Sequence, residues 1–396
     1  MLRGLVDTPE RRVLFAAGTL LFLAIGAMQA MYGPAFPAFL ARYHVGVGQV
    51  GAVVSAHFLG SFVTIAASGV LLVRFGYRRL LLAGTAGLTL GAAGVALSPS
   101  WGLTLAAALL GGLGFGLVDV ATNLLFARWY GARATGALNL LNAAFGLGAV
   151  LGPVAVGLLA PRVAPAFLLV AFLTVIAAAF CARAPMPEPL AVPAGALRAA
   201  RAPLLGFMVL YFLYVSSEVG VASWEPTYLA PLLGQAHAAF FTGLYWGSLT
   251  FGRFVAALLG ERFRPADMVL GASLLALGAA WLANATQVAP LAYALVGFAF
   301  APIFPTALAW LQQVFPQRSE QITPVVIAVA SLGPVLTAPA IGWAVAWSGT
   351  ARIPMVLGSL VLALCLVIAM MWRAMRGGAG DGGSARPSRS GGEGAR

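Results

Sequence analysis

The sequence contains no lysine and few charged residues of any kind. Only 9% of its 396 residues are charged, whereas a soluble globular chain carries about 25%. Apolar residues make up 61% of the chain and gather in long runs. This composition excludes a soluble domain and predicts an all-α protein that crosses a lipid bilayer many times.

Cysteine, histidine and acidic residues are scarce as well. Cys181 and Cys365 lie in separate apolar runs, far from His44, His57 and His237, so we expect neither a disulfide framework nor a metal site. No nucleophile–base pair stands out, so we expect neither an enzyme nor a resident cofactor. The net charge of +12 is not arranged in a basic cluster with interleaved aromatic residues, which argues against nucleic acid as a partner.

Twelve apolar runs are each long enough to span a membrane, which takes about 20 residues. The first lacks a small-residue cleavage site, so we interpret it as a retained helix and not a signal peptide. The runs cover residues 13–40, 48–73, 79–97, 101–127, 135–160, 164–182, 204–230, 238–260, 266–284, 289–314, 321–346 and 350–374.

The arginines indicate how the chain is oriented. Nineteen of the 23 fall in loops on the side that holds the N-terminus, whereas Arg42, Arg162 and Arg352 lie on the other side and Arg253 lies within a span. Because basic loops stay in the cytoplasm, we expect both termini to be cytoplasmic. The use of arginine alone is typical of a GC-rich genome. We expect the protein to lie in the cytoplasmic (inner) membrane of a bacterium.

A Pro-rich, basic loop divides the chain into two halves. We expect an N-terminal six-helix bundle over 1–182, a cytoplasmic linker over 183–203, a C-terminal six-helix bundle over 204–376 and a disordered cytoplasmic tail over 377–396. Six plus six helices is the layout of a two-repeat secondary transporter, whose substrate site lies near the midplane between the halves. We expect it to act as a monomer.

Three of the 11 acidic residues fall within spans, namely Asp119, Glu218 and Glu225. A charge near the bilayer centre costs about 3 kcal/mol or more, so each is a candidate functional residue. Asp119 shares a helix face with Asn123, four residues on. A carboxylate there can bind a proton or a sodium ion and couple it to a solute, or it can serve only to hold two helices together.

Span seven has the richest polar face, with Tyr214, Glu218 and Glu225 beside Trp224. Carboxylates accept paired hydroxyl donors, and aromatic rings stack on sugar rings, so we expect this face to bind substrate, with Glu218 also coupling the ion. Two other roles stay open, because Trp224 lies where interfacial anchors lie and Glu225 could be a gate.

Asn139 and Asn142 share a face of span five and could bind sugar hydroxyls as donors or acceptors, or bond a neighbouring helix. Span ten carries Pro302 and Pro305, which break the helix ladder. Carbonyls freed at such a depth line a cavity or are satisfied by neighbouring helices, so we expect a conformational role there.

The loop after span two, with Arg74, Gly76 and Arg78, resembles the signature loop of the major facilitator superfamily, although Val73 replaces its acid. Gly252 and Arg253 stand at the equivalent turn of the second half. The resemblance implies a gating role for these residues, and the alternative is that they only anchor the chain at the membrane surface.

Several stretches together are similar to the fucose–proton symporter branch of this superfamily and to its sodium-dependent glucose transporters. They are Asp119 with Asn123, Asn139 with Asn142, Glu218-Val219-Gly220 with Trp224, Trp246-Gly247 with Gly252-Arg253-Phe254, and Phe304-Pro305-Thr306. The resemblance implies the major facilitator fold and cation-coupled sugar uptake, with Asp119 at the position of a proton-coupling acid. A second acid of those symporters aligns near Gln29, a weaker substrate candidate, so H⁺ and Na⁺ both stay open.

The sequence thus predicts a symporter that imports a monosaccharide-like solute by alternating access. A proton-driven exporter of amphipathic compounds is the alternative, since Gly148, Gly152, Pro153 and Gly157 resemble the span-five motif of antiporters. A membrane receptor that binds solute without moving it is a third reading.

Overall fold

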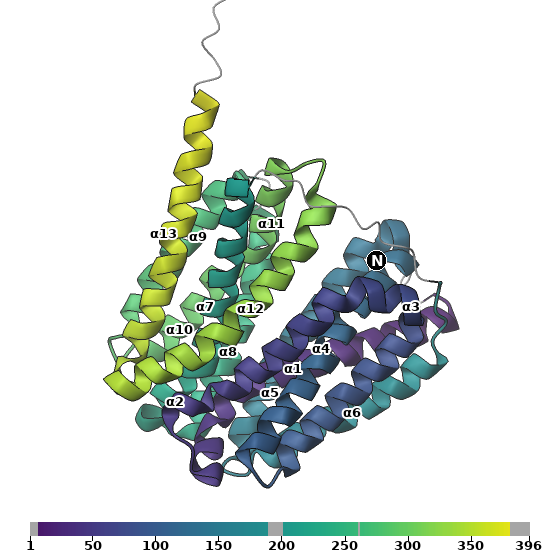
Figure 1. Cartoon of the computed structure of the whole chain (residues 1–396). Helices are drawn as coiled ribbons and strands as arrows, with labels where there is room; N and C mark the ends of the chain where they lie inside the picture. Colours follow the sequence, from purple (N-terminus) through teal and green to yellow (C-terminus); the bar gives the residue numbers. More distant parts are fainter. Residues whose placement is uncertain (1–6, 189–200, 260–261, 381–396) are drawn as a thin grey trace, which may run out of the picture.

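A computed structural model describes residues 7–188, 201–259 and 262–380 of the chain (Figure 1). Its ordered elements are helices, and no strand occurs in these ranges. In chain order they are α1 (Pro9–Tyr43), α2 (Val47–Val50), α3 (Ala52–Leu97), α4 (Trp101–Tyr130), η2 (Gly131–Arg133), α5 (Ala134–Leu159), α6 (Ala164–Arg183), α7 (Arg201–Leu233), α8 (Gln235–Leu259), α9 (Pro265–Leu282), α10 (Ala289–Phe300), α11 (Ile303–Val314), α12 (Ser319–Ser348), η4 (Thr350–Arg352) and α13 (Ile353–Gly380).

These helices make twelve crossings, as the sequence predicts. Nine segments of the described chain are long and apolar enough to span a membrane, and two of them turn back on themselves, one at Gly76 and one at η2. Helix α8 adds the last crossing. The predicted all-α fold of two six-helix halves is confirmed.

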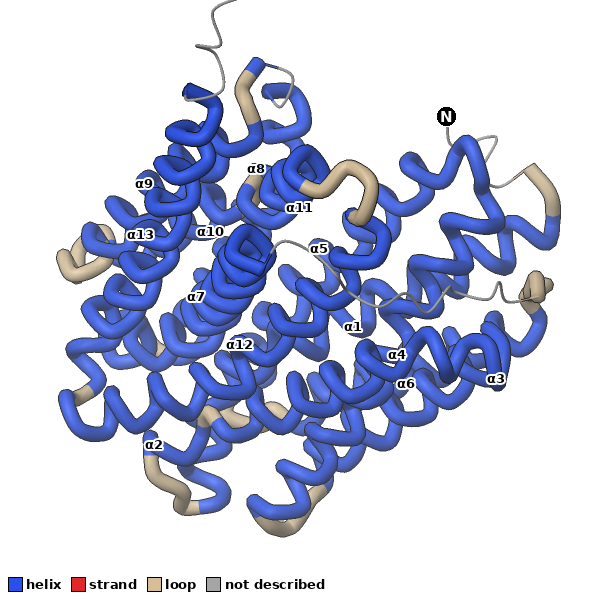
Figure 2. The backbone as a smooth tube through the Cα atoms, turned by 45° about the horizontal axis from the view of Figure 1, so that its top comes forward, coloured by secondary structure: helices blue, strands red, loops and turns tan. Residues whose placement is uncertain are grey.

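The halves meet along α1, α3 and α5 of the first and α7, α8 and α12 of the second (Figure 2). In Figure 1, α1 and α12 lie close together beside α2 and diverge toward the end of the bundle that holds the N-terminus. We call this end, where α1 begins and α13 ends, the termini side. The predicted boundaries differ slightly, because α7 begins at Arg201 and α13 continues to Gly380. Most of the predicted linker (189–200) and tail (381–396) lies outside the described residues.

The N-terminal half is packed closely through glycine. Helices α3 and α4 approach so tightly that a side chain at Gly112 would collide with the backbone of His57. The reversal within α3 depends on Gly76, whose φ of 74° is strained for residues with a Cβ. Small residues give membrane helices close van der Waals contact, which is the main attraction between helices in lipid.

The C-terminal half contains a broken helix instead. The predicted span ten is divided into α10, which ends at Phe300, and α11, which begins at Ile303, with Pro302 capping α11 and Pro305 in its first turn. A proline lacks the N–H that would bond the preceding turn, so backbone carbonyls at this depth need other donors. Two tyrosines of α7 donate to carbonyls beside this break, those of Phe300 and Phe304.

Candidate functional site

The two halves are in close contact on the side opposite the termini. Gly33 of α1 lies so near Ser223 of α7 that no side chain would fit between the helices. Phe36 packs edge-on against Trp224, with ring centroids 5.2 Å apart. Nearby, the Ser55 hydroxyl of α3 reaches the carbonyl of Pro334 of α12 at 3.5 Å. We call these contacts the outer seal.

Helices α5 and α8 show where this contact ends. Gly243 of α8 packs on Val150 of α5, and Gly146 of α5 packs on Thr250 of α8. One turn farther toward the termini side, the same helix faces carry Asn142, which is exposed, and Arg253, which is 34% exposed. Polar side chains from both halves therefore border the interface where the halves stop burying each other.

Arg253 reaches from this border to Glu218, on the polar face of α7. One guanidinium nitrogen lies 3.8 Å from Oε1 of Glu218, whose side chain is only 10% exposed. The same carboxylate oxygen accepts a hydrogen bond of 2.8 Å from the Tyr214 hydroxyl. Tyr245 of α8 donates to the backbone carbonyl of Glu218 at 3.0 Å. A buried carboxylate is stable only with such partners, so these contacts explain how Glu218 is accommodated.

Tyr214 also connects Glu218 to the broken helix. Its hydroxyl lies 3.2 Å from the carbonyl oxygen of Phe300, the last residue of α10, as well as 2.8 Å from Glu218. One turn away, Tyr211 donates to the carbonyl of Phe304 at 2.8 Å. A tyrosine hydroxyl has one proton, so it can donate to only one of these two acceptors at a time. We call Arg253, Glu218, Tyr214 and Tyr245 the α7–α8 network.

The predicted polar residues of the N-terminal half lie apart from this network. Asp119 of α4 is half-buried and accepts a hydrogen bond of 3.0 Å from Asn123, the partner that the spacing predicts. Asn142 donates to the Leu138 carbonyl of its own helix at 2.9 Å, and Asn139 is exposed. None of the described contacts joins Asp119 to Glu218.

Gln29, which stands near the position of the second acid of the related symporters, lies on the face of α1 that meets α5 and the other half. On α1, Gly26 packs against the backbone of Phe145 of α5, and Gly33 packs against α7. Gln29 is on the same helix face between these two glycines and is half-buried. Its amide is thus a polar group on the α1 face that meets both α5 and the other half.

Trp224 and Glu225 are fully buried, so neither is open to a solute in this conformation. Trp224 belongs to the outer seal, and a side chain at Gly51 or Gly342 would collide with its ring or approach it closely. Glu225, the next residue, points into the C-terminal half, where it faces Thr242 of α8 and Tyr293 of α10.

The predicted gating residues have structural partners at the termini side. Arg78 donates from its two terminal nitrogens to the carbonyls of Ala182 and Ala184 at 2.6 and 3.0 Å, which fastens the turn within α3 to the end of α6. Arg74 lies over the Phe75 ring at 5.4 Å. Gly252 packs closely on Phe298 and Ala301 beside the α10–α11 break.

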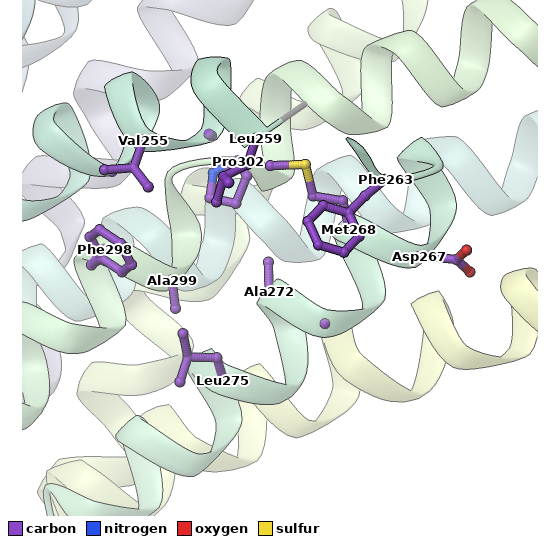
Figure 3. Close-up of a pocket in the computed structure, with 13 residues that line it drawn as sticks. Val255, Leu259, Phe263, Asp267, Met268, Ala272, Leu275, Phe298, Ala299 and Pro302 are labelled. Atoms are coloured by element: carbon purple, nitrogen blue, oxygen red, sulfur yellow. The ribbon is translucent and has the colours of Figure 1, made fainter. Parts of the chain in front are cut away.

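A pocket of about 280 Å³ lies within the C-terminal half, between α8, α9 and α10 (Figure 3). Its walls are almost entirely carbon, from residues such as Val255, Leu259, Phe263 and Leu275. Asp267 lies at its edge and accepts a hydrogen bond of 2.6 Å from Trp372. This pocket suits an alkyl chain and contains none of the predicted substrate ligands. In the described ranges, no three of His, Cys, Asp and Glu come together as a metal site.

Sequence reasoning missed the partnership between Arg253 and Glu218. Arg253 is the one arginine within a span and Glu218 is one of three acids there, and those two facts could have suggested the pair. It also missed His57, a fully buried histidine of α3 whose Nδ1 lies 3.3 Å from the Tyr32 hydroxyl. The sequence around His57 is apolar and gave no signal of this contact.

Comparisons with known proteins agree with this architecture. The chain resembles the crystal structure of the nucleoside transporter NupG, with 13% identity, a TM-score of 0.75, and coverage of 92% of this chain and 100% of that one. The inward open xylose transporter XylE from E. coli is 14% identical, with a TM-score of 0.77 and coverage of 91% of this chain and 95% of that one. FucP in the outward conformation is 17% identical, with a TM-score of 0.63 and coverage of 90% of this chain and 98% of that one. A search of curated protein sequences found no match.

At these identities the structures establish only the fold. The sequence itself matches the family model described as Major Facilitator Superfamily over residues 18–319, which is most of the chain. Together with twelve crossings in two halves and a polar network at their interface, this match identifies the chain as a multi-pass membrane transporter of the Major Facilitator Superfamily.

Proposed function

We propose that the protein is a secondary active symporter that couples H⁺ or Na⁺ to the uptake of a monosaccharide-like polar solute. The observation that carries the proposal is the α7–α8 network, which places an arginine and a carboxylate at the border of the two halves, 34% and 10% exposed. Such groups are costly within a membrane and are retained where they bind substrate or ions.

The chemistry of the network suits a hydroxylated ring. A carboxylate accepts hydrogen bonds from neighbouring hydroxyls, and a guanidinium donates to ring and hydroxyl oxygens. At 3.8 Å the Arg253–Glu218 pair is too far apart for a hydrogen bond, so both groups keep hydrogen-bonding capacity for solute hydroxyls. Asn142 and Gln29 would add neutral donors and acceptors from the other half, whereas Asn123 and Asn139 would line its approach. Trp224 would contact the solute only when the outer seal opens.

Tyr214 gives a physical route from cation binding to helix movement. When Glu218 is ionised, its carboxylate is a stronger acceptor than the Phe300 carbonyl, so the Tyr214 hydroxyl donates its hydrogen bond to Glu218. When a cation or a solute neutralises Glu218, Tyr214 can donate to the Phe300 carbonyl instead, 3.2 Å away. This second bond stabilises the break between α10 and α11. Pro302 and Pro305 would then act as the hinge, with Asp119 as the coupling acid of the other half.

The closed side of the molecule supports inward release. The outer seal lies opposite the termini, and the arginine bias favours termini in the cytoplasm. The structure would then be the form that faces the cytoplasm. Opening on the other side requires the contacts at Gly33, Trp224 and Ser55 to separate, which is alternating access by rocking of two halves.

Structural neighbours support a hydroxylated solute, since they include a D-xylose–proton symporter and a nucleoside transporter. A pentose ring is common to both of those substrates. The apolar pocket between α8, α9 and α10 favours the alternative, export of amphipathic compounds, because its carbon walls would accept an alkyl chain.

A thermal-shift screen tests the proposal. Purified protein would be heated with a panel of sugars, nucleosides and amphipathic drugs, at two pH values and with or without sodium. A ligand that binds only the folded state raises the melting temperature. We expect a sugar or nucleoside to stabilise wild-type protein and not the Glu218→Gln variant. Stabilisation by amphipathic drugs alone would favour the exporter.

A further inference from the structure

Glu225 is the most thoroughly buried acid in the described chain, and the proposed solute path does not use it. It is 0% exposed, and neither carboxylate oxygen has a hydrogen-bond partner among the described residues. It lies in the outer half of α7, directly after Trp224, and points into the C-terminal half.

Hydroxyl groups surround it, and none of the described arginines lies against it. Thr242 and Tyr245 of α8 and Tyr293 of α10 face it, and Tyr228 of its own helix packs against Tyr293. Thr242 donates to the Ala238 carbonyl at 3.3 Å, and the Tyr293 hydroxyl has no partner in the described residues. Tyr245 is also close to Glu218 and Arg253, the charged groups of the α7–α8 network. The neighbouring Trp224 points the other way, toward Phe36 of α1, Gly51 at the start of α3 and Gly342 of α12.

A carboxylate in these surroundings binds a proton. Burying an ionised group without a partner costs several kcal/mol, and such groups become neutral instead. We propose that Glu225 is a proton-binding site within the C-terminal half, and that it takes up its proton as the outer seal closes. Among the described residues, no cation neutralises this acid in the closed form.

The outer seal packs against the turns of α7 and α8 that carry Glu225 and Thr242. On α7 the two residues before Glu225 pack against the other half and α12, Ser223 against α1 and Trp224 against α1 and α12. On α8, Gly243, which follows Thr242, packs against Val150 of α5. When the halves separate here, helix faces on both sides of Glu225 lose their cover. The acid can then ionise, with the free Tyr293 hydroxyl and Thr242 as donors to the carboxylate. Closing the seal removes this water and requires the proton.

This inference rests on the proposed alternating access, but it needs no solute. It makes the equilibrium between open and closed outer sides depend on pH, because a proton is bound in one form and not in the other. One proton changes that equilibrium by at most tenfold per pH unit. Failure of every solute to bind would refute the proposed substrate and would not affect this prediction.

The test is the labelling of a cysteine in the outer seal. Ser55→Cys places a thiol against Pro334 at a half-buried position, where access for a maleimide increases when the seal opens. Both native cysteines are buried. The labelling rate of the purified protein would be measured across pH and divided by that of Ala285→Cys, which is exposed, because thiol reactivity itself depends on pH.

We expect the normalised rate to fall severalfold on acidification with Glu225 present. Adding Glu225→Gln, which mimics the neutral acid, should give a slow rate at every pH. Glu225→Asp should restore a pH dependence, and the exposed control Glu10→Gln should behave as its parent. The inference is overturned if the parent rate does not change with pH, or if the Glu225→Gln rate follows the parent. A rate set by sodium at constant pH would also overturn it, because the site would then bind sodium.

Infrared spectra give a second readout that does not depend on the variant's labelling. At neutral pH the wild-type protein should show the carbonyl stretch of a protonated carboxyl group without hydrogen bonds. Glu225→Gln should lack this band, and Glu10→Gln should retain it. A wild-type spectrum without the band would contradict the proposal even if Glu225→Gln failed to fold.

Discussion

The two halves of the molecule share one fold and handle their intramembrane polar groups in different ways. In the N-terminal half, the carboxylate of Asp119 is bonded within its own helix, by Asn123. In the C-terminal half, Glu218 is linked to two neighbouring helices, through Arg253 of α8 and through Tyr214 to the carbonyl of Phe300. The intramembrane acid of one half is bonded within its own helix, and Glu218 of the other half belongs to a network that joins three helices.

Helix packing follows the same division. The glycines of α3 and α4 hold the N-terminal half in close backbone contact, which favours a rigid body. The C-terminal half contains the α10–α11 break, whose carbonyls depend on tyrosine hydroxyls. A hydrogen bond that can choose between two acceptors is a two-state element, so we expect the bending during transport to be concentrated in the C-terminal half.

The largest effect should follow from removing the network's cation. Arg253→Met leaves Glu218 without a positive partner, and because Arg253 is 34% exposed the cost is smaller than the about 3–5 kcal/mol of a fully buried pair. We expect uptake to fall at least 100-fold and the melting temperature to drop. The exposed Arg162→Met is the control and should change neither. In the double variant with Glu218→Gln, the melting temperature should recover while uptake stays low, and a normal uptake rate in Arg253→Met alone would refute the role of the network.

A smaller structural effect should follow from Asp119→Asn in the other half. The amide keeps an oxygen that accepts from Asn123, so we expect little change in stability. In proteoliposomes, accumulation of solute driven by an ion gradient should be abolished, while exchange of solute across the membrane partly survives. Normal accumulation in this variant would show that Asp119 does not couple the ion.

The smallest effects should separate two tyrosines of α7. Tyr211→Phe and Tyr214→Phe each remove a hydroxyl that donates to a carbonyl at the helix break, and each should cost about 1 kcal/mol of stability. Only Tyr214 also reaches Glu218, so only Tyr214→Phe should change how the uptake rate depends on pH or sodium. Equal profiles in the two variants would refute the two-acceptor mechanism.

Local periodicity was enough to predict the contacts within single helices. The four-residue steps from Asp119 to Asn123 and from Tyr214 to Glu218 both became hydrogen bonds. The twelve spans followed from apolar run length, and Pro302 with Pro305 marked the real break in span ten. Each of these features depends on neighbours in the sequence.

Contacts between helices were beyond that reasoning. Arg253 and Glu218 meet because α7 packs on α8 at a particular rotation, and the apolar runs do not encode that rotation. The same limit applies to Trp224 and Glu225. They are adjacent in sequence, yet one faces the other half of the molecule and the other faces α8 and α10. A helix turn of about 100° per residue separates their directions.

Uptake into proteoliposomes tests the central claim most directly. Vesicles containing the purified protein would be given a sugar or nucleoside that stabilises it in the thermal-shift screen, first with an inward gradient of protons or sodium and then without one. We predict accumulation above the external concentration with one of the two gradients, and none in vesicles that carry Glu218→Gln. Equilibration without accumulation under both gradients, or undiminished accumulation by Glu218→Gln, would contradict the account.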